Sequence, residues 1–150
     1  MVIDESVWQL MKERLGYDDE EMKKFKDDPR NAEVLAKAQA LSNMTIVAEV
    51  IESNNCNSQH KVGDKFIFDA VGNLLTSKNP KRICIFALAR LAMIIFAVDE
   101  LIYAGVDPNE IKYKRTGCFD VGIDCGGWGH IVMEVRVEDR RKQQQVPDVA

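Results

Sequence analysis

This sequence of 150 residues has few of the features that mark exported, membrane-spanning or nucleic-acid-binding proteins. It contains only four cysteines, two histidines and four prolines. No stretch reaches the ~20 apolar residues that a membrane helix needs, because Arg90 interrupts the longest apolar run, from Ile83 to Val98. The N-terminal residues form neither a basic nor an apolar segment. We therefore expect no export signal, no membrane span and a cytoplasmic protein with reduced thiols.

The chain also lacks an excess of basic residues. Its formal net charge is −4, whereas domains that bind nucleic acid through a basic surface have the opposite balance. Hydrophobic residues make up 46% and charged residues 29% of the sequence, which is typical of a folded domain. We expect one core and no nucleic-acid partner.

Residues 1–44 are predicted to form a helical N-terminal arm. Asp4 and Asp18 are suited to cap two short helices, Gly16 to end the first of them, and Pro29 to begin a third. The apolar stripe of these helices is thin. The arm is therefore expected to pack against the main domain, a partner protein or another copy of the chain.

Residues 45–139 are predicted to form an α+β core domain. The pattern indicates strands at 45–53 and 66–68, with a return at 71–75, and later at 110–115 and 131–137. Between them, an apolar helix is expected from Pro80 to Ala104, ended by Gly105. The predicted fold is a small antiparallel sheet from two hairpins packed on one long apolar helix. The polar tail, residues 140–150, is predicted to be disordered.

Cys56 and His60 lie four residues apart in a polar loop, where a thiolate and an imidazole could reach one metal ion. Two donors are too few, and Cys118 and Cys125 could complete the set, with His130 in reserve. Such ligands suit zinc or iron. The site requires both hairpin loops to lie at the same end of the sheet. The alternative is that Cys56 and His60 merely belong to a surface loop.

Cys84 lies early in the predicted long helix, just after Lys81 and Arg82. A helix N-terminus and nearby cations lower the pKa of a thiol, so Cys84 is a candidate nucleophile. The alternative is a small buried hydrophobic residue, the commoner role of a free cysteine in an apolar segment.

The segment from Gly117 to His130 contains five of the nine glycines. Trp128 could form an aromatic wall for a cofactor, and Asp120 could act as an acid–base group. A long hairpin connection that needs glycine to turn explains the same residues. The segment does not match a phosphate-binding fingerprint.

The pattern Cys56-x-x-x-His60-x-Val62-Gly63-Asp64-x-Phe66, followed by Cys84 and by Cys118-x-Asp120, resembles a small family of uncharacterised prokaryotic proteins. The resemblance covers about two-thirds of the chain. It implies that Cys56, His60, Cys84 and Cys118 act as a set, and it implies no substrate.

The leading hypothesis is a Cys/His site that binds zinc or iron, or holds a reactive thiolate. If the site is catalytic, we expect metal-assisted chemistry on a small-molecule substrate, with an open metal position and Asp120 as the acid–base group. A second hypothesis is a non-catalytic accessory or oligomerising subunit that uses the arm or the apolar helix as its interface. A third is a thiol redox protein with a reversible disulfide between Cys118 and Cys125.

Overall fold

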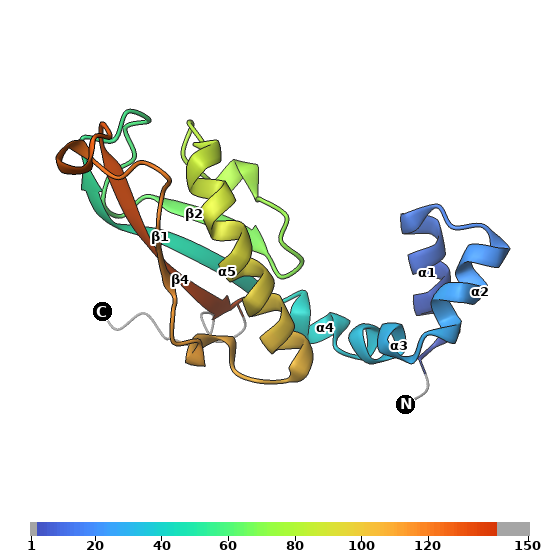
Figure 1. Cartoon of the computed structure of the whole chain (residues 1–150). Coiled ribbons are helices and arrows are strands. Elements are labelled where there is room, and N and C mark those ends of the chain that lie inside the picture. Colours follow the sequence, from blue (N-terminus) through green and yellow to red (C-terminus); the bar gives the residue numbers. More distant parts are fainter. Residues whose placement is uncertain (1–2, 141–150) are drawn as a thin grey trace, which may run out of the picture. The chain divides into compact units, whose positions relative to one another are not determined.

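The computed structural model describes residues 3–140, except for the side chains of residues 39 and 40. The chain divides into two compact units, Met1–Ser42 and Asn43–Ala150, which we call the arm and the core unit (Figure 1). The predicted disordered tail lies outside the described residues, apart from residue 140. The predicted boundary at residue 44 falls inside the first strand, which already begins at Met44.

The arm consists of short, strongly capped helices. Asp18 and Glu21 form a reciprocal capping box, Asp4 and Asp28 cap two other helices, and Gly16 ends the first helix with φ 71°. Trp8 packs edge-on against Phe25, with ring centroids 5.9 Å apart. The helices are α1 (Glu5–Leu15), α2 (Asp19–Asp27), α3 (Pro29–Ala36) and α4 (Ala38–Leu41).

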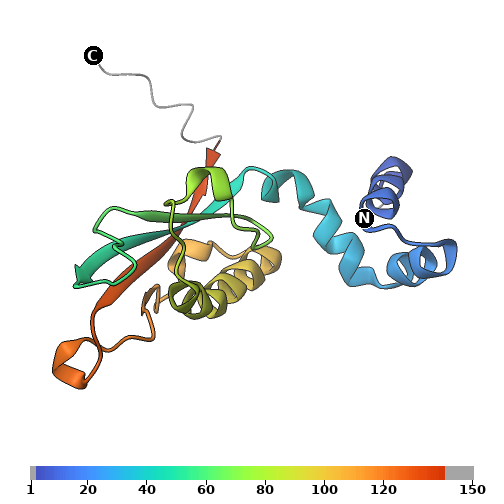
Figure 2. The ribbon, with the colours of Figure 1, turned by 90° about the horizontal axis from the view of Figure 1, so that it is seen from above.

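The core unit confirms the predicted α+β fold. Its strands form a four-stranded antiparallel sheet in the order β2-β1-β4-β3, so each hairpin contributes one central and one edge strand. A long helix, α5, lies across one face of this sheet (Figures 1 and 2). The strands are β1 (Met44–Asn54), β2 (Lys65–Asp69), β3 (Arg115–Gly117) and β4 (His130–Asp139).

Helix α5 (Ile85–Ala104) ends at Gly105, which has φ 76° as predicted for a helix C-terminus. One side of the helix is buried and forms the core together with strand residues such as Phe66 and Met133, both fully buried. The buried positions of α5 recur at helical spacing: Ala87, Leu91, Ile95, Val98 and Ile102. None of the helices within residues 3–140 has the length and apolarity to cross a membrane.

The predicted start of the long helix was wrong: the helix begins five residues later than Pro80. Asn79 explains the delay, because its side chain accepts the amide N–H of Ile67 and donates to the carbonyl oxygens of Ile67 and Leu75. These bonds hold the chain along β2 before it can turn into the helix. The predicted return at 71–75 is reduced to a single bridge between Phe68 and Leu74.

The strand predicted at 110–115 was also misplaced, because β3 begins only at Arg115. A short 3-10 helix, Pro108–Glu110, precedes it and is capped by Asp107. The Asn109 side chain takes the place of a strand there: it donates to the carbonyl oxygen of Val137 and accepts its N–H. Two hydrogen bonds of the Asn109 side chain thus replace the backbone pairing expected from the strand predicted at 110–115.

Candidate functional site

Three segments of the core unit meet at one end of the sheet, which we call the loop end. They are the connections 55–64 and 118–129, which leave the sheet beside the last β1–β4 pair, Asn54 with His130, and the start of α5 at Cys84. All four cysteines and both histidines of the chain lie in or beside these segments. The structure therefore meets the condition set for a shared Cys/His site, that both connections lie at the same end.

Direct contacts join the three segments. The Ser58 hydroxyl lies close enough to the thiol of Cys84 to lower its pKa, which places the first connection beside the helix. On the other side, Phe119 packs edge-on against Phe86 with ring centroids 6.5 Å apart, and the Arg90 guanidinium lies 5.2 Å from the centre of the Phe119 ring. Helix α5 thus bridges the two connections through its first two turns.

Cys84 is the N-cap residue of α5 and has an extended backbone. Burial raises the pKa of its thiol, but the nearby Ala87 amide, Ser58 hydroxyl and Phe86 amide outweigh burial and lower that pKa, although the Cys84 side chain accepts no capping hydrogen bond in this structure. No acidic residue lies in the first turn of the helix, where it would oppose a thiolate. The arrangement favours a thiolate at the positive end of a 20-residue helix.

His60 is buried, with 3% of its surface exposed, although the sequence placed it in a polar loop. Its ring packs edge-on against Phe66, and its Nδ1 lies 3.7 Å from Oδ2 of Asp64. Asp64 also accepts the amide N–H of Lys61, which is the turn role expected for it. The Nε2 atom of His60 is buried and has no partner among the described residues, so this nitrogen is available for a bond that the fold itself does not use.

The other three cysteines of the loop end are free thiols with different exposure. Cys56 is half-buried, and its carbonyl oxygen accepts the amide of Gln59 in a turn. Cys118 is half-buried, and its thiol donates to the carbonyl oxygen of Asp120. Cys125 is exposed in a short 3-10 helix, Ile123–Cys125.

Asp120 organises the glycine-rich connection. Its carboxylate accepts the backbone N–H groups of Gly122, Trp128 and Gly129 at 3.0–3.2 Å. The amides of Gly122 and Gly129, and then that of Trp128, hold the pKa of Asp120 below its ordinary range despite a small opposing effect of burial. A carboxylate kept ionised in this way is a poor general acid, so the structure gives the residue a positioning role.

The glycines of this connection are explained by close approach. A Cβ atom on Gly129 would collide with the carbonyl oxygen of Asn55, and one on Gly127 with the Asp120 carboxylate. Of the two explanations that the sequence left open, architecture accounts for both glycines.

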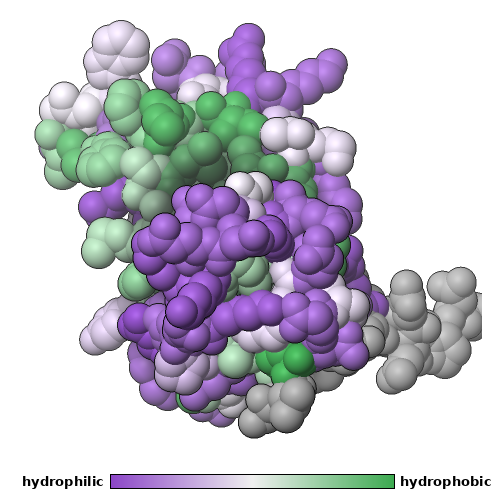
Figure 3. Space-filling view, turned by 90° about the vertical axis from the view of Figure 1, so that its right-hand side faces the viewer, coloured by the Kyte–Doolittle hydropathy of each residue, from purple (hydrophilic) through white to green (hydrophobic). Residues whose placement is uncertain are grey.

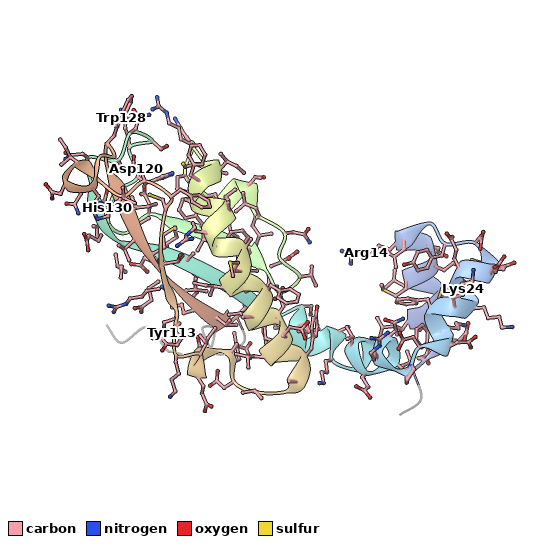
Figure 4. All side chains as sticks on the ribbon, in the orientation of Figure 1. Arg14, Lys24, Tyr113, Asp120, Trp128 and His130 are labelled. Carbon is pink, nitrogen blue, oxygen red and sulfur yellow. The ribbon has the colours of Figure 1, made fainter. Side chains whose placement is uncertain are left out.

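A cleft of about 290 Å³ lies beside the glycine-rich connection. His130 lines it and places Nε2 3.1 Å from a carboxylate oxygen of Glu52, while its buried Nδ1 has no partner among the described residues. Trp128 forms another wall and is 75% exposed. Figure 4 shows Trp128 at the outer tip, with Asp120 and His130 below it. Trp128 is thus placed as an open aromatic wall, not a packed core residue.

Within residues 3–140, no three His, Cys, Asp or Glu side chains are arranged so that they could hold a metal ion. The loop end gathers the segments that carry Cys56, His60, Cys118 and Cys125, but not their donor atoms around one point. A zinc or iron site would therefore require these connections to rearrange.

Sequence reasoning missed two residues of the loop end. Ser58 supports the Cys84 thiol across 26 positions of sequence, and no spacing rule would have paired them. Glu52 reaches His130 because the β1–β4 register shifts between Val50 and Glu52. A shift of this kind has no signal in the alternation of the strand.

No protein-family model, no curated protein and no solved structure matches this chain. The fold and the loop end define a small α+β protein whose cysteines and histidines gather at one end of an antiparallel sheet.

Proposed function

We propose that this protein performs thiol chemistry with Cys84 as its nucleophile. The observation that carries the proposal is the position of Cys84 as the N-cap residue of α5, where the nearby Ala87 amide, Ser58 hydroxyl and Phe86 amide lower the pKa of its thiol. These donors stabilise the thiolate, which is the nucleophilic form of cysteine. The substrate class that follows is an electrophile small enough to enter between the two connections.

His60 supports this assignment as the proton acceptor for Cys84. It belongs to the connection that places Ser58 against the thiol, its Nε2 is buried and unpartnered, and Asp64 lies beside its Nδ1. No hydrogen bond joins Nε2 of His60 to the Cys84 thiol in this structure, so transfer of the thiol proton to Nε2 requires the first connection to move toward the helix, with the Asp64 carboxylate orienting the ring. Cys84 is then the nucleophile, His60 the base and Asp64 a positioning residue.

The test is the pH dependence of alkylation by iodoacetamide, followed at each cysteine by mass spectrometry. We expect Cys84 to react with a midpoint below the ordinary thiol value of about 8.5. Ser58→Ala should raise that midpoint and slow the reaction at pH 7 by roughly two- to fivefold, because one hydrogen bond to the thiolate is lost. The Cys125 thiol of the same protein is the internal control, because it is exposed and lies in a short 3-10 helix. A Cys84 midpoint at or above that of Cys125 would contradict the proposal.

His60→Gln separates the base from the helix N-terminus. Loss of the imidazole should raise the Cys84 midpoint in the folded variant toward the ordinary thiol value. In the unfolded chain, the variant and the wild type should have the same midpoint. An unchanged midpoint in the folded variant would remove His60 from the mechanism while leaving Cys84 as the nucleophile.

Zinc or iron at Cys56, His60, Cys118 and Cys125 is a second proposal. It is favoured by the unpartnered Nε2 of His60 and by the convergence of the two connections that carry these residues. Metal content and free thiols are measured on the same untagged sample, purified without oxygen. Stoichiometric metal with protected thiols, lost in His60→Ala, supports it. Four freely reactive thiols without metal would contradict it.

A further inference from the structure

We infer that the outer face of α5 is a homodimer interface. The exposed positions of this helix are largely apolar, although they lie opposite the side that packs in the core. A helix with one face in water normally places charged residues there. On α5 the charged residues at exposed positions are Arg90 and Glu100. The apolar members of this outer face are Ile85, Phe86, Ala89, Ala92, Met93 and Phe96.

The exposure of these side chains is large. Met93 is 77%, Phe96 67%, Ile85 66% and Phe86 61% exposed. Figure 3 shows a hydrophobic surface in its upper part. In Figure 1, the same height holds the N-terminal half of α5 and the loop end. Phe119, which contacts Phe86 and is 56% exposed, extends the patch beyond the helix.

The area of the patch is close to what a stable dimer needs. If a large side chain presents roughly 200 Å² when fully exposed, the four on α5 expose about 540 Å². Such an area is near the upper limit for the largest apolar patch of a typical monomer, ~300–600 Å². With Phe119 and the two alanines it approaches the ~800 Å² that each partner buries in a standard interface.

The pattern along the helix is self-complementary, which favours a second copy over another occupant. In an antiparallel helix pair with its two-fold axis at the level of Leu91, Phe86 lies opposite Phe96 of the second copy. The same axis places the small Ala89 opposite the long Met93. Aromatic side chains thus face each other, and the long Met93 fits into the space above the small Ala89. Both contacts occur twice, as an isologous interface requires.

Charge argues against a membrane surface as the occupant. The Arg90 guanidinium lies over the Phe119 ring, Glu100 lies on the same helix, and the net charge of the chain is −4. A helix that binds in a membrane interface usually has a polar face rich in lysine and arginine. The outer face of α5 is therefore assigned to protein.

Sedimentation velocity of the 150-residue chain, from about 1 to 100 µM, tests the inference. We expect the wild type to sediment as twice 17.0 kDa. Met93→Glu and Phe96→Glu should each raise the dimer dissociation constant by at least about 30-fold, because a charge would be buried without a partner. Both positions are exposed in the single chain, so far-UV circular dichroism should be unchanged.

Leu10→Glu is the matched control, because Leu10 is a 61% exposed apolar residue of the arm. The control should remain dimeric. A wild type that is monomeric at 100 µM, or dimers that persist in both α5 variants, would overturn the inference. So would dissociation by Leu10→Glu alone, which would assign assembly to the arm. Sedimentation of a monomeric wild type with phosphatidylcholine–phosphatidylglycerol vesicles would assign the face to lipid and overturn it equally.

Discussion

The two ends of the sheet in the core unit use carboxylates in the same way but differ in what surrounds them. At the loop end, Asp120 accepts three backbone amides and holds the glycine-rich connection in shape. At the opposite end, Asp69 accepts the amides of Val71 and Asn73 and closes the turn after β2. The loop end adds cysteines and histidines to this frame, whereas the opposite end adds more carboxylates.

Asp99 of α5 shows what that difference means. Its Oδ1 is buried and has no partner among the described residues. Burial, followed by the negative charges of Asp69 and Glu100, raises its pKa to about 6. The loop end thus stabilises negative charge at Cys84 and Asp120, and the opposite end opposes it. In both turns, Asp69 and Asp120 therefore serve mainly to hold the backbone by accepting its amides.

The largest expected effect removes the packing that both ends share. Leu91 is fully buried in the middle of α5, so Leu91→Ala should lower the free energy of unfolding by about 2–5 kcal/mol. Urea unfolding followed by circular dichroism measures it, with the exposed Leu10→Ala as the control. A change below 1 kcal/mol would mean that α5 does not pack on the sheet as described.

An intermediate effect breaks one end and spares the other. Asp120→Ala leaves the amides of Gly122, Trp128 and Gly129 without their carboxylate, so their hydrogen exchange should become faster while that of the sheet is unchanged. Asp69→Ala is the matched control at the opposite end and should loosen only the turn after β2.

The same loop carries a pH dependence with a definite sign. Because the pKa of Asp120 is lowered in the folded protein, its stabilising contribution is present above the ordinary pKa of aspartate. That contribution is lost only as the pH falls through the lowered value. If Asp120→Ala accelerated the hydrogen exchange of backbone amides at both ends of the sheet, the local role of Asp120 would be contradicted.

The smallest effect is a gain. Because the pKa of Asp99 is raised to about 6, its contribution to stability is fully present below the unfolded value near 4 and is lost as the pH rises through 6. Asp99→Asn should therefore stabilise the protein by about 1 kcal/mol at pH 8, after allowance for solvent screening, and by nothing near pH 4. Thermal unfolding at both pH values measures it, with Glu33→Gln as the control, because Glu33 is exposed and does not affect the pKa of Asp99. Equal gains in stability at pH 4 and pH 8 would show that the ionisation of Asp99 is not the cause of the gain.

Much of the fold could be predicted because its signals are local. Alternation at 131–137 marked β4, and Gly105 marked the end of α5. The start of α5 and the place of β3 could not be predicted, because Asn79 and Asn109 bond through their side chains to strands far away in the sequence. Local patterns contain no record of such bonds.

The candidate site was predictable as a set of segments and not as a set of atoms. The order of hairpins was enough to bring the connections that carry Cys56 and Cys118 to one end. The burial of His60 and the contact of Ser58 with Cys84 depend on how the first connection folds back toward the helix. That path depends on tertiary packing, which the polar composition of the loop conceals.

The contact of Gly129 with the carbonyl oxygen of Asn55 has a consequence for how the loop end can respond to a ligand. With no side chain between them, the two backbones touch directly, so neither connection can shift inward without displacing the other. We therefore expect a reaction at Cys84, beside which Ser58 of the first connection lies, to displace the second connection as well. A change in the fluorescence of Trp128 on that reaction would test this expectation.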